Sequence, residues 1–241
     1  MKACSQAFFL FNMTHKPKIA KKDTPKMFDG IAGTYDKLNH ILSFGMDKRW
    51  RRVFVKNIAF QEYRNIADIA SGTGDLLVEL QKLSSKKYYA VDPAAKMLEI
   101  AKSKLPHAEF IVSGAESLPL DENSIDLITV SFGIRNFADL GQSFSEFYRV
   151  LNTGGIVSIM EFARPKFFLF RWGHRLYLRL FLPIIGRLVS RDKKAYKYLQ
   201  ASIFDFAKNV DVIQLLEAKG FTKRNVKKLL LGSVNIYTVV K

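Results

Sequence analysis

The sequence has only one cysteine, Cys4, among its 241 residues. A disulfide framework and a cysteine cluster for a metal ion are therefore excluded within the chain, and a reducing, cytoplasmic location is expected. No stretch reaches the roughly 18 consecutive apolar residues of a membrane-spanning helix. A secretory signal is not expected either, because the apolar residues 7–11 precede the lysines of 16–26 instead of following them.

Acidic residues are scarce relative to basic ones. The chain has 22 Asp and Glu against 38 Lys and Arg, which gives a formal net charge of +16. An excess of this size predicts attraction to an anionic partner, either nucleic acid or a membrane surface with anionic lipids. Composition alone does not distinguish the two.

Internal repeats, low-complexity tracts and long linkers are also missing. With 48% hydrophobic residues, the chain can bury a full core. Residues 26–241 are therefore interpreted as a single domain, preceded by a disordered basic arm at residues 1–25.

A glycine is missing where a dinucleotide-binding site needs one. Residues 65–77 form an apolar run, a turn with Gly72 and Gly74, and the start of an amphipathic pattern, which predicts a strand, a turn and a helix. A nicotinamide or flavin site requires a third glycine where this chain has Leu77. The open turn and the unpaired N–H groups of the helix start still favour an anionic group.

S-adenosylmethionine fits this pattern better, because it carries no phosphate. Its carboxylate suits the glycine turn, its ammonium suits Asp68 at the end of the first strand, and its ribose hydroxyls suit Asp92 at the end of the second. A Gly-x-Gly turn alone is a weak signal. The turn, the spaced acid and the missing glycine together favour this cofactor.

The rest of the domain alternates between strand-like and helix-like segments. This alternation predicts an α/β fold with a doubly wound, parallel sheet. The strand-like runs 221–231 and 234–240 predict an antiparallel hairpin added to that sheet.

Residues 26–58 have a helical apolar pattern with polar residues interleaved, among them Tyr35, Asp36, Asn39 and Asp47. Two interpretations stay open. The segment is either a cap packed over the sheet, with Asp47 capping the next helix, or a lid over the cofactor and substrate pocket.

Two further segments leave the carboxyl edge of the predicted sheet, where such folds bind ligands. The loop 113–120 is predicted to form a wall for the adenine. Arg135 follows the fourth strand, and it either pairs with Asp139 on the surface or acts in the pocket.

A basic and aromatic insertion is predicted at residues 164–191. Arg171, Arg175 and Arg179 recur at every fourth position beside bulky apolar residues. A helix packed on the sheet is one interpretation, and a membrane-surface element is the other. The density of Leu, Phe and Ile exceeds what an RNA surface needs, so lipid is favoured.

Several segments resemble the menaquinone/ubiquinone biosynthesis C-methyltransferases, which use S-adenosylmethionine to methylate a polyprenyl quinol ring. The resemblance runs from about Met27 to Lys241 and is most specific in residues 27–51, Ser131-Phe-Gly-Ile-Arg135-Asn136, 148–155 and 198–203. It implies a Rossmann-like class I methyltransferase with a seven-stranded, mostly parallel sheet whose last strand is antiparallel, and a homodimer as one possible assembly.

The resemblance also implies roles for individual residues. Cofactor contacts are implied at Thr73, Asp92, Gly114, Ala115 and Ser131, and substrate contacts at Asn39, Asn136 and Ser202. Two departures stand out. Gly114 replaces the family's usual Asp or Asn, so Glu116 or the backbone is expected to serve instead, and Phe206-Ala207 replaces a His-Pro or Phe-Pro pair.

The reaction implied is methylation of demethylmenaquinol to menaquinol, with a polyprenyl methoxybenzoquinol as the alternative ring. Arg135 is expected to stabilise a phenolate, and a water held by Arg135 and either Tyr35 or Asp36 to take up a proton. No metal is expected. The predicted partners are the quinol and the inner face of a membrane, while an RNA methyltransferase and a cofactor-binding scaffold without turnover are the less favoured alternatives.

Overall fold

The computed structural model describes residues 20–165 and 193–241. Residues 1–19 of the expected arm and 166–191 of the expected insertion lie outside the described residues. The arginine-rich helix placed there therefore stays a prediction.

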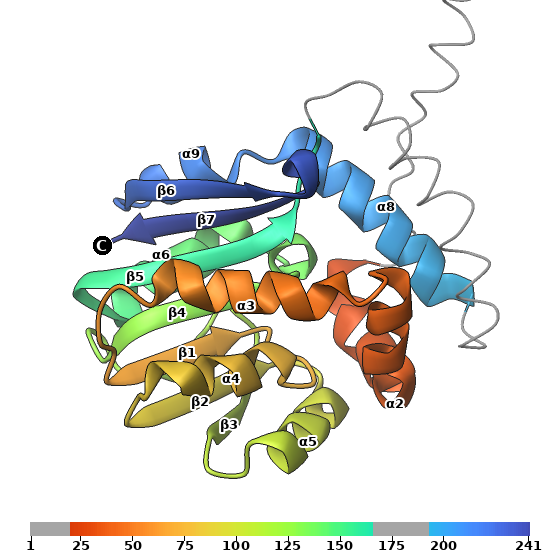
Figure 1. Ribbon diagram of the computed structural model, residues 1–241, viewed down its shortest axis with the longest axis horizontal. Coiled ribbons are helices and arrows are strands. Elements are labelled where there is room, and N and C mark those ends of the chain that lie inside the picture. The colour runs from red at the N-terminus through yellow and green to blue at the C-terminus, as the bar shows by residue number, and fades with distance from the viewer. Residues whose placement is uncertain (1–19, 166–192) are drawn as a thin grey trace, which may run out of the picture.

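One sheet runs through the described part of the chain (Figure 1). Its strands are β1 (Asn65–Ile69), β2 (Lys87–Asp92), β3 (Glu109–Val112), β4 (Ile125–Ser131), β5 (Leu151–Phe162), β6 (Thr222–Leu229) and β7 (Val234–Val240). Their order across the sheet is β3-β2-β1-β4-β5-β7-β6. The first five strands pair in parallel, whereas β7 lies antiparallel to both β5 and β6. The predicted seven-stranded sheet with an antiparallel last strand is confirmed.

The helices form two layers around this sheet. The α-helices are α2 (Thr24–Leu42), α3 (Met46–Ile58), α4 (Asp75–Leu80), α5 (Ala95–Lys104), α6 (Leu140–Val150), α8 (Lys193–Asn209) and α9 (Val212–Glu217), and the short 3-10 helices are η1 (Lys21–Asp23), η2 (Gln81–Leu83), η3 (Ile134–Asn136) and η4 (Leu230–Gly232). Figure 1 shows α3 and α4 in front of the sheet and α6 and α9 behind it.

Each layer packs through an apolar stripe at helical spacing. Trp50, Phe54 and Ile58 recur at every fourth position of α3 and are buried against the front of the sheet, while Phe144 and Phe147 of α6 are buried behind it. Burying such a side chain contributes roughly 1.5–3 kcal/mol relative to exposure. The two apolar clusters hold the carboxyl edge of the sheet between them.

The N-terminal helices differ from the prediction in two places. Helical structure begins at Lys21, ahead of the boundary expected at residue 26, and Thr24 is already buried. The prediction that Asp47 caps the next helix is wrong. Gly45, with φ +74°, is the N-cap of α3, and Asp47 lies inside the first turn, where its carboxylate accepts hydrogen bonds from Ser43 and Arg51.

Candidate active site

The candidate site lies between β1 and β4, where the order in which the chain adds strands to the sheet reverses. β1 and β4 are parallel neighbours, but the chain winds away from them on opposite sides, and such a switch point leaves a crevice at the carboxyl ends of the strands. Ala70 and Phe132 follow these two strands with φ values of +54° and +56°, which residues other than glycine rarely adopt. Backbone strain of this kind clusters at functional sites. Both residues line two adjoining cavities.

The glycine turn packs closely against α5. Gly74 has φ +78°, and a Cβ on it would lie 2.9 Å from the Cβ of Ala101 on α5, so only glycine lets the turn sit against that helix. Asp92 of β2 braces the same turn, because its two carboxylate oxygens accept the N–H groups of Gly72 and Ala94, each at 2.8 Å. Burial raises the pKa of Asp92 to about 6, against the effect of these two hydrogen bonds.

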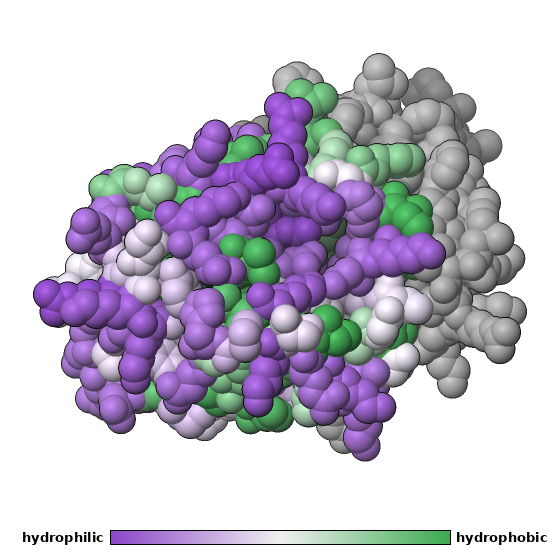
Figure 2. All heavy atoms as spheres, turned by 60° about the horizontal axis from the view of Figure 1, so that its bottom comes forward, coloured by the Kyte–Doolittle hydropathy of each residue, from purple (hydrophilic) through white to green (hydrophobic). Residues whose placement is uncertain are grey.

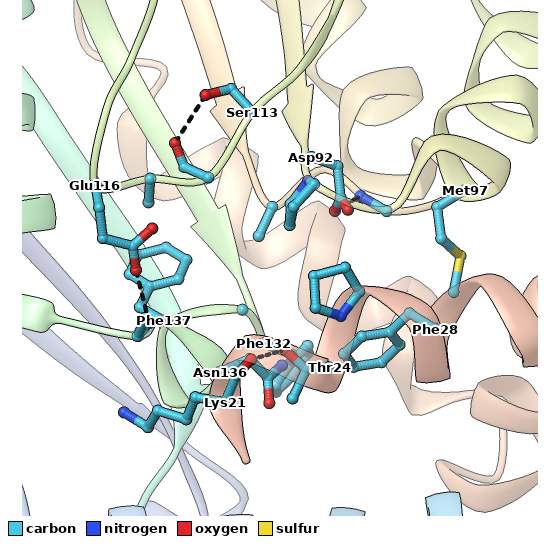
Figure 3. A pocket seen from close by; sticks show the side chains of 18 of the residues that line it. Lys21, Thr24, Phe28, Asp92, Met97, Ser113, Glu116, Phe132, Asn136 and Phe137 are labelled. Carbon is cyan, nitrogen blue, oxygen red and sulfur yellow. Dashed lines mark hydrogen bonds between the residues drawn. The ribbon is translucent and has the colours of Figure 1, made fainter. Parts of the chain in front are cut away.

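The first cavity has a volume of about 210 Å³ and extends from Asp92 to the loop after β3. Figure 3 shows Asp92 and Met97 on one side of it, Phe28 and Thr24 of α2 below, and Glu116 and Phe137 at the far end. Predicted cofactor residues Gly72, Asp92, Gly114, Ala115 and Ser131 all line it. A carboxylate at one end and apolar walls beyond it match a ribose and an adenine.

The departure at Gly114 has a structural explanation. A Cβ there would lie 2.7 Å from Oε2 of Glu116, so the Glu116 carboxylate occupies the space that a longer side chain would need. Oε1 of Glu116 accepts the N–H groups of Ala138 and Asp139. Glu116 thereby ties the loop after β3 to the segment after η3 and closes the adenine end of the cavity.

The second cavity is larger, about 370 Å³, and mainly apolar. Its walls come from the turn between α2 and α3, the end of β5, α8 and η4, and its apolar members are Leu42, Phe44, Met46, Trp50, Leu76, Phe132, Phe162, Leu199, Ile203, Leu230 and Val234. The two cavities share Tyr35, Ala70, Gly72, Ser131 and Phe132. Their junction is the place where a group bound in one cavity can react with a group bound in the other.

Asp68 lines this second cavity and is 1% exposed. Its Oδ1 accepts the hydroxyl of Thr129 at 2.6 Å, while its buried Oδ2 accepts no hydrogen bond from the described residues. Burial raises the pKa of Asp68 to about 7, and the nearby Asp92 adds to the rise. A buried carboxylate with an unused oxygen at the cavity wall is suited to a cationic ligand.

Charged side chains fasten α2 to the glycine turn. Asp36 accepts the hydroxyl of Thr73 at 2.5 Å and the ammonium of Lys104 at 2.7 Å. Lys104 also contacts Asp75 at 2.6 Å, and Arg51 of α3 contacts Asp75 at 3.0 Å. The lid interpretation of the N-terminal segment is favoured by this geometry, because α2 lines both cavities, α3 lines the second, and polar contacts hold both helices to the segment around the glycine turn.

Of the two interpretations of Arg135, the surface ion pair with Asp139 is not formed. It lies on η3, is 5% exposed, and its Nη1 contacts Oε1 of Glu161 at 2.9 Å and the carbonyl oxygen of Phe132. Asp139 instead caps α6 by accepting the N–H of Gln142. Arg135 therefore faces the second cavity as half of a buried ion pair.

The predicted substrate residues have different surroundings. Asn39 lines the second cavity and hydrogen-bonds the hydroxyl of Tyr35, and Asn136 lines the first cavity and accepts the hydroxyl of Tyr198 at 3.0 Å. Ser202 is buried and donates to the carbonyl of Leu199 in its own helix, so it lines neither cavity. Among the residues of α8 whose side chains the structure describes, Leu199 and Ile203 line the second cavity.

Sequence reasoning missed Glu161, Lys104 and Tyr198. One signal was available for Glu161, because an acid that ends the apolar strand 156–161 needs a partner when it is buried. Lys104 reaches the site from a helix distant in sequence, and nothing in its local pattern marks it. Tyr198 begins the segment 198–203 that resembles the family, but the resemblance gave it no role. Within the described residues, no group of three or more His, Cys, Asp or Glu could hold a metal ion.

Comparison with known protein families identifies the class of methyltransferase to which the chain belongs. The model of the ubiE/COQ5 methyltransferase family matches residues 16–241. The chain belongs to this family. The ubiquinone/menaquinone biosynthesis C-methyltransferase UbiE of Geotalea daltonii is 37% identical over 237 residues, which cover 95% of this chain and 99% of that protein. The demethylmenaquinone methyltransferase of Porphyromonas gingivalis is 34% identical, with 89% and 91% covered.

Solved structures agree on the fold. A methyltransferase of Thermotoga maritima, described as dependent on S-adenosylmethionine, superposes with a TM-score of 0.62 at 21% identity and covers 90% of this chain and 98% of that one. A second one from Methanococcus maripaludis has a TM-score of 0.57 at 20% identity, with 94% and 95% covered. This ubiE/COQ5 methyltransferase therefore has the class I fold.

As a ubiE/COQ5 methyltransferase, the protein is an S-adenosylmethionine-dependent C-methyltransferase. Its cavities fit that cofactor: the unused Asp68 oxygen suits the ammonium, the glycine turn the carboxylate, and Asp92 the ribose. In this fit the ribose and adenine would occupy the first cavity, and the amino-acid portion would border the second. The reactive methyl group would then lie near the shared wall.

Proposed function

We propose that this enzyme transfers a methyl group to a ring carbon of a polyprenyl quinol, and that its substrate is demethylmenaquinol, which becomes menaquinol. The observation that carries the proposal is the apolar second cavity, which opens onto the cofactor cavity at Tyr35 and Phe132. A naphthalene ring and the first part of a prenyl chain are apolar, and such a cavity binds them mainly through the hydrophobic effect.

Arg135 and Tyr35 are the proposed catalytic residues. A quinol carbon becomes nucleophilic when the neighbouring hydroxyl loses its proton, and the bound cofactor supplies an electrophilic methyl group. Arg135 lines the cavity and stabilises the phenolate that develops. Burial raises the pKa of Tyr35, so its hydroxyl keeps its proton and donates a hydrogen bond toward the same oxygen.

Asp36 is better suited to holding the lid than to taking up a proton. Both of its carboxylate oxygens are engaged, one by Thr73 and the other by Lys104. We therefore assign Asp36 to closure of α2. The water expected between Arg135 and Tyr35 stays the proposed proton acceptor.

The ring identity rests on likeness to relatives. The Porphyromonas gingivalis relative is named a demethylmenaquinone methyltransferase, while the Geotalea daltonii relative is named for both quinones. A polyprenyl methoxybenzoquinol is therefore the second candidate substrate. An RNA substrate is disfavoured by the apolar lining of the second cavity, which offers leucine, isoleucine and phenylalanine side chains to a polar base and backbone.

Access from a membrane is part of the proposal, because a polyprenyl quinol dissolves in the bilayer. No helix of the described residues has the length and apolarity needed to span a membrane. Figure 2 shows a face on which hydrophilic side chains predominate and hydrophobic ones form small patches. At the second cavity, however, Phe44 is 71% exposed, and Leu231 beside the lining residue Leu230 is 60% exposed. We infer that this apolar rim meets the lipid.

The assay that tests the function supplies labelled S-adenosylmethionine with reduced demethylmenaquinone or with a reduced polyprenyl methoxybenzoquinone, in detergent. We expect methylation of demethylmenaquinol, and a loss of about 100-fold or more in kcat for Arg135→Lys, which keeps the charge but not the planar fork. Lys86→Ala, an exposed change, is the control. Methylation of neither quinol by a protein that binds the cofactor would overturn the proposal.

A further inference from the structure

Glu161 is a completely buried acid that the reaction described above does not use. It is the next-to-last residue of β5 and has no exposed surface. Its carboxylate accepts hydrogen bonds from Nη1 of Arg135, from the N–H of Phe162 at 2.9 Å and, more weakly, from the N–H of Arg135 at 3.4 Å. Burial raises the pKa of Glu161, while the Arg135 guanidinium and these hydrogen bonds act against that rise and favour the carboxylate. An ion pair buried this deeply is costly to desolvate and adds little stability over an apolar pair. A functional reason for keeping it is therefore worth seeking.

The reason lies in the charge of the cofactor. Its ribose and adenine fit the first cavity and its amino-acid portion fits the Asp68 side of the second, so its cationic sulfur lies near the shared wall. Arg135 borders the same wall: it donates to the carbonyl of Phe132, and its charge acts on the hydroxyl of Tyr35. An isolated guanidinium at this place would repel the sulfonium in surroundings with little water.

We propose that Glu161 is the counter-ion that lets the site hold a guanidinium and a sulfonium together. By making the Arg135–Glu161 pair neutral overall, it permits Arg135 to stand at the reacting ring without weakening cofactor binding. Glu161 is thus a positioning residue that acts through Arg135. The inference deepens the proposed function at the same site, but it depends only on cofactor binding and not on the identity of the quinol.

The decisive measurement compares two ligands that differ in one charge. S-adenosylhomocysteine has the same amino-acid, ribose and adenine groups as S-adenosylmethionine but a neutral sulfur. Isothermal titration of the purified full chain with each ligand gives the ratio of their dissociation constants. A residue with only a structural role would change both constants together and leave the ratio unaltered.

Glu161→Gln keeps the shape of the side chain and removes its charge. We expect this variant to bind S-adenosylmethionine about tenfold more weakly or worse, and S-adenosylhomocysteine within about twofold of the wild type. Arg135→Gln removes the cation instead and should shift the ratio in the opposite direction, toward S-adenosylmethionine. The double variant Arg135→Gln/Glu161→Gln should restore a ratio close to that of the wild type.

The double variant also protects the test against misfolding, because it leaves neither a cation nor an anion buried alone. A control exists in α6, where Glu146 and Arg149 form a partly exposed ion pair that lines neither cavity, so Glu146→Gln should leave the ratio unchanged. Equal weakening of both ligands by Glu161→Gln, or no weakening of either, would overturn the inference. Because no quinol is present, this result is independent of the methylation assay.

Discussion

Asp68 and Asp92 stand at the ends of neighbouring strands with raised pKa values, about 7 and about 6. In both cases burial is the largest cause, and it disfavours the charged form until a cation arrives. The site is therefore prepared for a ligand that brings its own positive charge. Elsewhere in the chain the balance is basic, so these acids are local exceptions to the net charge of +16.

Cofactor affinity should consequently depend on pH. As pH rises from about 5.5 to 8, Asp68 loses its proton near its pKa of about 7 and becomes able to pair with the ammonium of the ligand. We expect the dissociation constant of S-adenosylmethionine to fall by roughly tenfold over this range, measured by titration calorimetry at constant ionic strength. Asp68→Asn should bind more weakly and with a much flatter profile.

The raised pKa of Asp68 also determines whether the free energy of unfolding rises or falls with pH when no ligand is bound. A carboxyl group whose pKa is raised in the folded state stabilises the fold most when it is protonated, and this contribution is lost as pH rises through the folded-state value. Relative to wild type, Asp68→Asn should therefore gain free energy of unfolding between about pH 4 and pH 7 and stay level above that. A difference that does not change with pH would show that Asp68 is charged throughout.

Some residues of the site follow from the sequence and others do not. Asp68, Gly72 and Asp92 were predictable, because the end of a buried strand and a glycine turn fix their positions locally. Glu161 and Lys104 act across 26 and 68 residues of chain, on Arg135 and Asp36 respectively. Partners at such separations are set by the packing of whole elements, which local patterns do not encode.

At the scale of elements, the clearest device is the attachment of α2 to the cofactor turn. The Asp36–Lys104 ion pair joins α2 to α5, and the Asp36–Thr73 hydrogen bond joins α2 to the glycine turn. A second ion pair, between Lys104 and Asp75, links α5 to α4. The charged groups are partly exposed, so each ion pair is worth only about 0.2–1 kcal/mol. Contacts of that strength hold a helix in place while still allowing it to open.

Removing Lys104 should therefore loosen α2 without unfolding the protein. We expect amide hydrogen exchange within Thr24–Leu42 to accelerate by roughly two- to tenfold in Lys104→Met, and cofactor affinity to fall by a similar factor. Lys102→Met, which removes an exposed cation from the same helix, is the control. Unchanged exchange in α2 would mean that apolar contacts alone hold the lid.

Element boundaries show where sequence patterns succeed. β1 begins at residue 65 and β2 ends at Asp92, as predicted, because each is a buried apolar run between polar residues. β5 includes the segment 152–155, although its two glycines are typical of a turn. There β4 and β5 shift register, so the extra residues form a bulge instead of ending the pairing.

At the scale of the whole molecule, exposed cations near the apolar rim extend the proposed contact with anionic lipid. Lys48, Arg52 and Lys56 form a stripe along the exposed side of α3, opposite its buried apolar stripe. The edge strand β6 contains cations and no acid, and it contacts the far end of α3, where Asn225 hydrogen-bonds Asn57. The apolar rim of the second cavity lies where α3 begins and β6 ends.

This surface consists of other residues than the membrane contact predicted on residues 164–191, most of which lie outside the described part of the chain. Cations near an anionic surface each contribute about 1 kcal/mol, and a buried leucine side chain adds roughly 1.5–3 kcal/mol. A rim of exposed apolar residues beside cations can therefore bind a bilayer reversibly. It would also place the mouth of the apolar cavity at the surface where the prenyl tail lies.

A substitution at Leu231 tests directly whether the apolar rim of the second cavity contacts the bilayer. Its backbone is left-handed, with φ +53°, a conformation that asparagine tolerates better than leucine. Leu231→Asn should therefore keep or raise the melting temperature, while its partition into vesicles containing phosphatidylglycerol falls roughly tenfold in a sedimentation assay. A loss of binding in a protein that is no less stable cannot be attributed to unfolding.

Charge reversal on α3 tests how much the cations of this helix contribute to vesicle binding. Lys48→Glu/Arg52→Glu should also weaken vesicle binding by at least about tenfold, and more strongly at low salt, because both changes act on the electrostatic attraction. Lys86→Glu/Lys102→Glu makes the same change of charge on exposed residues that line neither cavity, so it separates local contact from net charge. If the control pair weakens binding equally, the attraction is a property of the whole charge. If none of the variants weakens it, the membrane contact lies elsewhere on the molecule and the rim serves only to admit the substrate.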